Sequence, residues 1–207
     1  MKQAYELFQE MKPETALSVF QYLRGEQREV YKAALSSLAT NRKLRLVFVQ
    51  RKPVAEQIDW ALKNIKLRGS AEIAAQVLQL WLLKAHTPLL TDFLDGLGIE
   101  HDGEGAAEDI PDDLDAKKLK STVEGLLKKY DAETVRIYLH IFQLQKSQGW
   151  SELSTLIEST PALQFGAAAD AAPATEAPAD DAEKPAKKKA APKKKAAEAP
   201  AEPADEA

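Results

Sequence analysis

The sequence predicts an all-α fold, with a compact domain of about seven short helices over residues 1–165 and a disordered tail over residues 166–207. Three observations lead to this prediction. Apolar residues recur at helical spacing in the first 165 residues. Glycines and prolines there fall mostly between the periodic segments, as expected of short helices joined by tight turns. Six of the 11 prolines lie in the tail, which consists almost entirely of Ala, Pro, Lys, Asp and Glu and buries too little apolar surface to become ordered.

Two amphipathic helices are expected early in the chain, each with a charged face opposite an apolar stripe. The first stripe consists of Val30, Tyr31, Ala34, Leu35 and Leu38, and the second, which comes after Pro53, consists of Val54, Ile58, Ala61, Leu62 and Ile65. Between them lies "KLRLVFVQRKP" (residues 43–53), whose Val and Phe content suits a strand as well as a helix. We predict a helix, because no second strand-like run exists with which a strand could pair.

Two later segments are more apolar and are expected at the centre of the domain. In "SAEIAAQVLQLWLLKAH" (residues 70–86) the polar stripe is formed by Glu72, Gln76 and Gln79. In "AETVRIYLHIFQLQKSQ" (residues 132–148) it is formed by Arg136, His140, Gln143 and Ser147. The second stripe has two interpretations. It either faces solvent, or presents Arg136, His140 and Gln143 to a partner or a polar cleft.

Two stretches of the chain align without gaps, residues 7–16 ("LFQEMKPETA") and residues 126–135 ("LLKKYDAETV"). Each ends one predicted helix and begins the next through a Glu-Thr pair. A weaker similarity relates residues 48–60 to residues 83–95, where each contains a helix end, a proline and a new helix. These similarities indicate either two related helical units or the same boundary chemistry used twice.

Charge is concentrated in two regions of opposite sign. Residues 42–68 contain two acids and eight cations, for a net charge of about +6: Arg42, Lys43, Arg45, Arg51, Lys52, Lys63, Lys66 and Arg68. Arg42, Arg45 and Lys52 would share one face of a continuous helix and contact phosphates there. The other interpretation is a solvated pair of helices, and it is favoured by the expectation that no aromatic side chain lies among the cations for base stacking.

The acidic region, residues 92–115, contains ten acids and no Lys or Arg, for a net charge of about −10. His101, Asp102 and Glu104 are clustered there in a glycine-containing loop, but their spacing is not that of a calcium-binding EF-hand. We therefore predict no metal site. A second possibility is that these acids cover the basic region and compete there with an anionic partner.

No catalytic or cofactor-binding motif is present, so we expect neither an enzyme nor a cofactor. The absence of cysteine fits a reducing compartment, and no apolar run has the length of a signal peptide or a membrane span, so we expect a cytoplasmic protein without membrane contact. The predicted function is that of a non-enzymatic helical adaptor that binds another macromolecule, most readily a protein, with its oligomeric state left open.

The alternative is a nucleic-acid-associated protein that contacts phosphates through residues 42–68 and through a lysine block at residues 184–195. The candidate phosphate ligands in the block are Lys187, Lys188, Lys189, Lys193, Lys194 and Lys195. The tail as a whole carries nine acids against seven lysines, for a net charge of −2. It is a polyampholyte, and we expect any phosphate contact that it makes to be weak and sensitive to salt.

Overall fold

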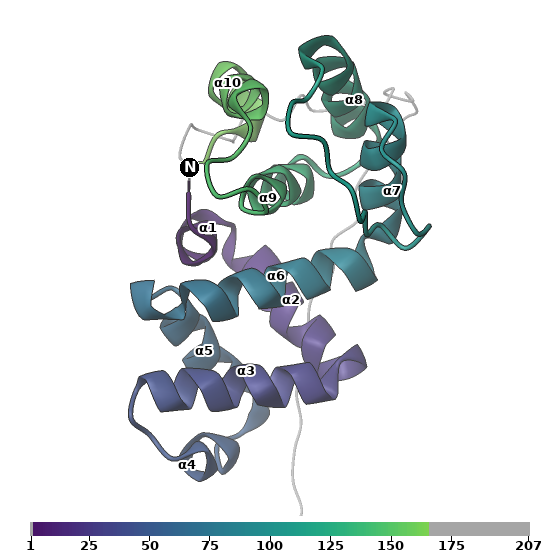
Figure 1. Cartoon of the computed structure of the whole chain (residues 1–207). Helices are drawn as coiled ribbons and strands as arrows, with labels where there is room; N and C mark the ends of the chain where they lie inside the picture. The colour runs from purple at the N-terminus through teal and green to yellow at the C-terminus, as the bar shows by residue number, and fades with distance from the viewer. Residues whose placement is uncertain (1, 166–207) are drawn as a thin grey trace, which may run out of the picture. The chain divides into compact units, whose positions relative to one another are not determined.

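In the computed structural model, which describes residues 2–165, these residues form helices, turns and loops with no strand among them (Figure 1). The all-α prediction is confirmed, whereas the predicted disordered tail lies outside the described residues. The helices within this range are α1 (Ala4–Glu10), α2 (Pro13–Glu26), α3 (Arg28–Asn41), α4 (Leu46–Gln50), α5 (Val54–Ile65), α6 (Ala71–Ala85), α7 (Thr87–Leu97), α8 (Ala116–Lys129), α9 (Ala132–Gln143) and α10 (Ser151–Ser159), with short 3₁₀ helices η1 (Arg68–Ser70) and η2 (Pro161–Leu163).

The predicted number of about seven helices is too low for the described residues, which contain ten α-helices. The reason lies in junctions of a single residue. Gln27 alone separates α2 from α3, and His86 alone separates α6 from α7. Such a junction leaves no loop in the sequence to be recognised, because the apolar periodicity resumes almost at once. None of the helices in this part of the chain is long and apolar enough to cross a bilayer.

The two most apolar segments form α6 and α9, and both are at the centre of the domain, as predicted. In α6, the side chains of Val77, Leu78 and Leu82 are almost fully buried against α1, α2 and α9. Helix α9 is buried along its whole length from Glu133 to Gln143, because α1, α6, α8, α10 and η2 surround it.

Aromatic side chains connect α7, α9 and the start of α10. The Phe93 ring packs edge-on against Tyr138 and Phe142, with centroids 5.2 Å and 5.0 Å apart, and Phe142 stacks on Trp150 at 4.7 Å. Each such contact adds roughly 1 kcal/mol to the stabilisation from area burial alone. These rings hold the C-terminal part of the domain on α9.

The aligned stretches, residues 7–16 and 126–135, form helix boundaries at corresponding positions. Helix α2 begins at Pro13 and α9 at Ala132, the aligned residue. The two boundaries also touch: the Glu133 carboxylate accepts hydrogen bonds of 2.6 Å from the backbone N–H of Lys12 and from Thr15 Oγ1. Thus α9 caps the start of α2, where the chain supplies no side-chain cap of its own. The relation of the two units by duplication stays a prediction.

Candidate functional site

An exposed surface at α4 combines cations with large apolar side chains. Phe48 is 58% exposed, Leu44 46% and Val47 43%. Exposed basic residues precede and follow them along the chain. We call this group the α4 surface, and its members are Arg42, Lys43, Leu44, Arg45, Val47, Phe48, Arg51 and Lys52.

The α4 surface begins where the backbone ends α3, at residues 42–44. The N–H of Leu44 donates to the carbonyl of Ala39 (2.8 Å) and that of Lys43 to Thr40 (2.9 Å), a Schellman pattern that ends the helix. This pattern requires a left-handed residue, and Lys43 adopts it with φ 54° although glycine is favoured there.

Helix α4 is too short to bury more than one narrow side. Its five residues make less than one and a half turns, so Val49 is buried while Val47 and Phe48 face outward. The amide of Gln57 on α5 donates to the carbonyls of Gln50 (3.2 Å) and Lys52 (2.8 Å) and closes the junction after α4. The prediction of a helix in this segment is confirmed over Leu46–Gln50.

Two expectations about the basic region are corrected. Arg42 caps the end of α3, Arg45 precedes α4 and Lys52 comes after it, so these three cations do not share one helical face. The expectation that no aromatic side chain lies among them is wrong, because Phe48 is exposed between Arg45 and Arg51. Its position is visible in the sequence, but its exposure depends on which side of α4 the core covers.

The eight cations of residues 42–68 lie along several elements. Lys52 forms an exposed ion pair of 3.0 Å with Glu56, and within residues 2–165 the other seven form none. Lys63 and Lys66 lie at the far end of α5 from α4. Arg68 belongs to η1, whose Gly69 carbonyl accepts a 2.9 Å hydrogen bond from Asn41, so η1 lies beside the end of α3. Arg68 therefore extends the positive charge of the α4 surface.

The stripe of Arg136, His140 and Gln143 does not face solvent, since the three residues are only 7%, 6% and 2% exposed. The Arg136 guanidinium donates through Nε and Nη2 to the carbonyl of Ala162, at 3.0 Å and 2.8 Å. The Gln143 amide donates to the carbonyl of Trp150 (3.0 Å) and to Ser154 Oγ (2.6 Å). Part of the predicted stripe therefore binds the chain's own residues 150–165.

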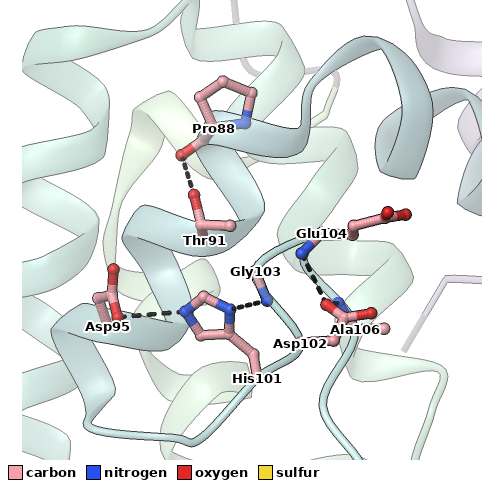
Figure 2. Close-up of polar contacts among 8 residues, drawn as sticks. All are labelled: Pro88, Thr91, Asp95, His101, Asp102, Gly103, Glu104 and Ala106. Carbon is pink, nitrogen blue, oxygen red and sulfur yellow. Dashed lines mark hydrogen bonds and ion pairs between the residues drawn. The ribbon is translucent and has the colours of Figure 1, made fainter.

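The loop between α7 and α8, residues 98–115, is called the acidic loop. It forms its own hydrogen-bond network, and its carboxylates do not point toward one common site (Figure 2). The His101 ring lies between Asp95 Oδ1, 3.1 Å from Nε2, and the backbone N–H of Gly103, which donates to Nδ1 at 3.0 Å. The Asp102 carboxylate accepts from the N–H groups of Glu104 (2.7 Å) and Ala106 (3.0 Å), and these bonds, that of Ala106 foremost, lower its pKa.

This network bears on both interpretations of the acidic region. No three His, Cys, Asp or Glu side chains within residues 2–165 come together as a metal-binding group. Figure 1 shows α4 at one end of the helical domain and the loop between α7 and α8 toward the other. Lys84 and Lys146, which lie outside the basic region, pair with Glu104 (3.0 Å) and Asp112 (3.5 Å) of this loop. The idea that the acids cover the basic region is therefore wrong for the described residues.

The acidic loop also borders an apolar cleft of about 500 Å³ between α6, α7 and α9. Close approach of the loop to α7 requires a glycine: Gly105 has φ +90°, and a Cβ there would lie 2.7 Å from Leu90 Cβ. The indole N–H of Trp150 donates to the carbonyl of Pro111 (3.0 Å) and holds the loop's far end. The cleft is lined mainly by Leu80, Leu83, Leu90, Leu94, Ile110 and Phe142.

The remaining candidate residues, the lysines of residues 184–195, lie outside the described residues. Comparisons with known proteins add no relative: no family model, no curated protein and no solved structure matches the chain. The fold alone therefore defines the class of protein. Residues 2–165 form a helical domain with an exposed basic and apolar surface at one end.

Proposed function

We propose that the protein is a non-enzymatic, cytoplasmic adaptor that binds an acidic partner protein through the α4 surface. The exposure of Phe48 between basic residues is the observation that carries the proposal. Covering apolar side chains releases roughly 25 cal/mol for each Å² removed from water, so Leu44, Val47 and Phe48 supply a driving force for association. Contiguous exposed apolar side chains with a charged rim are typical of protein interaction sites.

The composition of the surface favours a protein over a nucleic acid. Aromatic and arginine side chains are the usual anchors of protein interfaces, and the α4 surface contains Phe48 with Arg42, Arg45 and Arg51. Leu44 and Val47 have no π-face for stacking on a base, whereas they fill an apolar pocket well. The cations at the rim favour an acidic partner and increase the rate of encounter.

A second face supports the adaptor role in particular. The apolar cleft is lined by α6, α7, α9 and the acidic loop, and α4 contributes no residue to it. Figure 1 shows α4 and the loop between α7 and α8 toward opposite ends of the helical domain. One end of the domain thus offers apolar side chains with positive charge, and the other an apolar cleft bordered by negative charge. Two faces of different chemistry suit a protein that joins two partners.

The test is a matched pair of variants, Phe48→Ser on α4 and Leu17→Ser on α2, where Leu17 is also exposed (37%). A partner captured by the unaltered protein is purified, and its affinity for each variant is measured by calorimetry. Phe48→Ser is expected to weaken binding roughly 30-fold, the effect of losing an interface anchor worth about 2 kcal/mol. Leu17→Ser is expected to leave it unchanged. Equal affinities for the two variants would contradict the proposal.

The runner-up function is nucleic-acid binding through residues 42–68 and the lysines of residues 184–195, and Phe48 among the cations is the observation in its favour. Polarisation titrations with duplex and single-stranded oligonucleotides at two salt concentrations test it. Binding that falls steeply with salt, and that the double variant Arg45→Gln/Arg51→Gln abolishes, would replace the adaptor proposal. Absence of binding at low salt would remove the runner-up, and loss on deleting residues 166–207 alone would place the contact in the tail.

A further inference from the structure

The apolar cleft beside the acidic loop has two walls with helical spacing. The wall from α6 follows the pattern i, i+3, i+4 and i+7, which covers about 10 Å of one helical face. The wall from α9 and the turn after it has the same spacing. These walls consist of Gln76, Gln79, Leu80 and Leu83 on the one side, and of Tyr138, Ile141, Phe142 and Gln145 on the other. The α6 wall alone is therefore as long as two turns of a bound helix.

The floor of the cleft is aromatic, whereas its accessible walls are aliphatic. Tyr138 and Phe142 are only 4% and 2% exposed. Leu80, Leu83 and Ile110 are half-buried, so a bound molecule meets them first. Residues 2–165 contain no strand whose edge could pair with an extended segment, and proline-rich segments bind grooves lined by accessible aromatic rings. Of the common modes of peptide recognition, the cleft therefore suits an amphipathic helix that inserts apolar side chains.

The unpaired charge at the border of the cleft is negative. Glu108 and Asp109 are exposed and form no ion pair within residues 2–165. Their neighbours on the acidic loop, Ala107 and Ile110, line the cleft, so both acids lie at its border. The two lysines that pair with this loop are each already matched with an acid. A partner with positive charge beside its apolar side chains therefore complements this border.

We propose that the cleft binds a basic amphipathic helix of a second partner protein, an inference that rests on the adaptor function proposed above. Apolar side chains at positions i, i+3, i+4 and i+7 of that helix enter the cleft, and its Lys or Arg side chains lie against Glu108 and Asp109. Burial of the apolar side chains supplies most of the affinity, whereas the charges raise the rate of association and select against acidic helices. Because the α4 surface favours a partner of the opposite charge, the two faces do not compete for one partner.

The probe is a synthetic peptide of about 15 residues, long enough to form a helix on binding. It contains Leu at the i, i+3, i+4 and i+7 positions of one face, Lys on the flanks and Ala elsewhere. The control peptide has the same composition, with its Leu residues spread around the helix. With the full chain, calorimetry is expected to show roughly tenfold tighter binding of the patterned peptide, and amide NMR shifts are expected on α6, α9 and the acidic loop. Equal affinities, or shifts that spare α6 and α9, would overturn the proposal, because charge alone would then account for the contact.

A variant that fills the cleft tests whether the peptide lies inside it. Ala107 is half-buried on the loop side of the cleft, and Ala107→Trp is expected to weaken binding of the patterned peptide by roughly tenfold or more. Leu17→Ser, at an exposed site on α2, is the control that leaves it unchanged. Should Ala107→Trp fail to fold, Leu83→Gln, which places a polar group in the α6 wall, decides instead. Unchanged affinity in a folded cleft variant would refute the proposal.

A second pair of variants tests the charge at the border. Glu108→Gln/Asp109→Asn is expected to weaken binding roughly fivefold at low salt and less at high salt. Glu14→Gln/Glu26→Gln removes two exposed acids of α2 instead, and is expected to change the affinity by less than about twofold. The same loss from both pairs would show that only the net charge of the chain matters, and the basic character assigned to the partner would be wrong.

The outcome is distinguishable from that for the α4 surface. Phe48→Ser is expected to leave binding of the patterned peptide unchanged, because no residue of α4 lines the cleft. If the peptide does not bind, the cleft proposal fails, while the effect of Phe48→Ser on the captured partner still decides the α4 proposal. If the peptide binds in the cleft and Phe48→Ser does not weaken the captured partner, the α4 proposal alone fails.

Discussion

The polar stripes of α6 and α9 look alike in the sequence but have opposite environments in the fold. Glu72, Gln76 and Gln79 on α6 are exposed. Arg136, His140 and Gln143 on α9 have the same spacing and are at most 7% exposed. A polar stripe on an apolar helix therefore does not indicate by itself whether that side of the helix meets water.

The difference arises from the path of the chain after each helix. After α6 the chain turns at His86 into α7, and the α6 stripe stays uncovered. After α9 the chain reverses through a turn at Gly149, with φ +68°, and α10 and η2 return across the stripe. The stripe then donates hydrogen bonds to the returning backbone, at the carbonyls of Trp150 and Ala162.

The largest expected effect comes from placing the same charge on each stripe. Gln143→Glu puts a carboxylate against the Trp150 carbonyl in a buried site, and we expect it to lower the free energy of unfolding by about 4 kcal/mol at pH 7. Gln79→Glu, at an exposed site, is expected to change it by less than about 0.5 kcal/mol. Urea denaturation of both variants measures the difference, and equal stabilities would mean that the α9 stripe is open to solvent.

The next effect is a pH dependence confined to the covered stripe. Burial lowers the pKa of His140 from its ordinary 6.5 to about 4, so the unfolded chain binds more protons than the folded one between these values. Stability contributed by the neutral ring is therefore present above pH 6.5 and is lost as pH falls toward 4, by about 3 kcal/mol at most.

His140→Gln isolates this contribution, because His86, whose pKa burial also lowers, remains in both proteins. Urea denaturation at several pH values is expected to show a shallower decline below pH 6.5 for the variant. Parallel pH profiles for the variant and the unaltered protein would indicate that the His140 ring is solvated.

A smaller effect is expected from Arg136→Met, which keeps the aliphatic stem but removes two hydrogen bonds to Ala162 and the contact of the guanidinium with the Phe165 ring, 5.1 Å from its centroid. We expect a loss of about 2 kcal/mol. Hydrogen exchange should quicken first in residues 161–165. Gln76→Met on the exposed stripe serves as the control, with a change within about 0.5 kcal/mol. Unchanged exchange at residues 161–165 would show that the guanidinium does not hold this segment.

Much of the fold was predictable, since helical periodicity is local. It predicted the class, the central positions of α6 and α9 and the helical segment before Pro53. The number of helices was not predictable, because single residues such as Gln27 and His86 form whole junctions. For the candidate site, the cations were evident from composition, but their division among the junctions around α4, the end of α5 and η1 was not.

The sequence by itself determined which residues prefer a helix, where charge accumulates and which helices need the most neighbours. Only the tertiary structure decided which surfaces stay uncovered. Phe48 is exposed because α4 is too short to bury two sides, whereas His140 and Gln143 are enclosed because α10 and η2 fold back over them. The physical reason is that periodicity reports a residue's side of its own helix, while burial depends on contacts with elements distant in the chain.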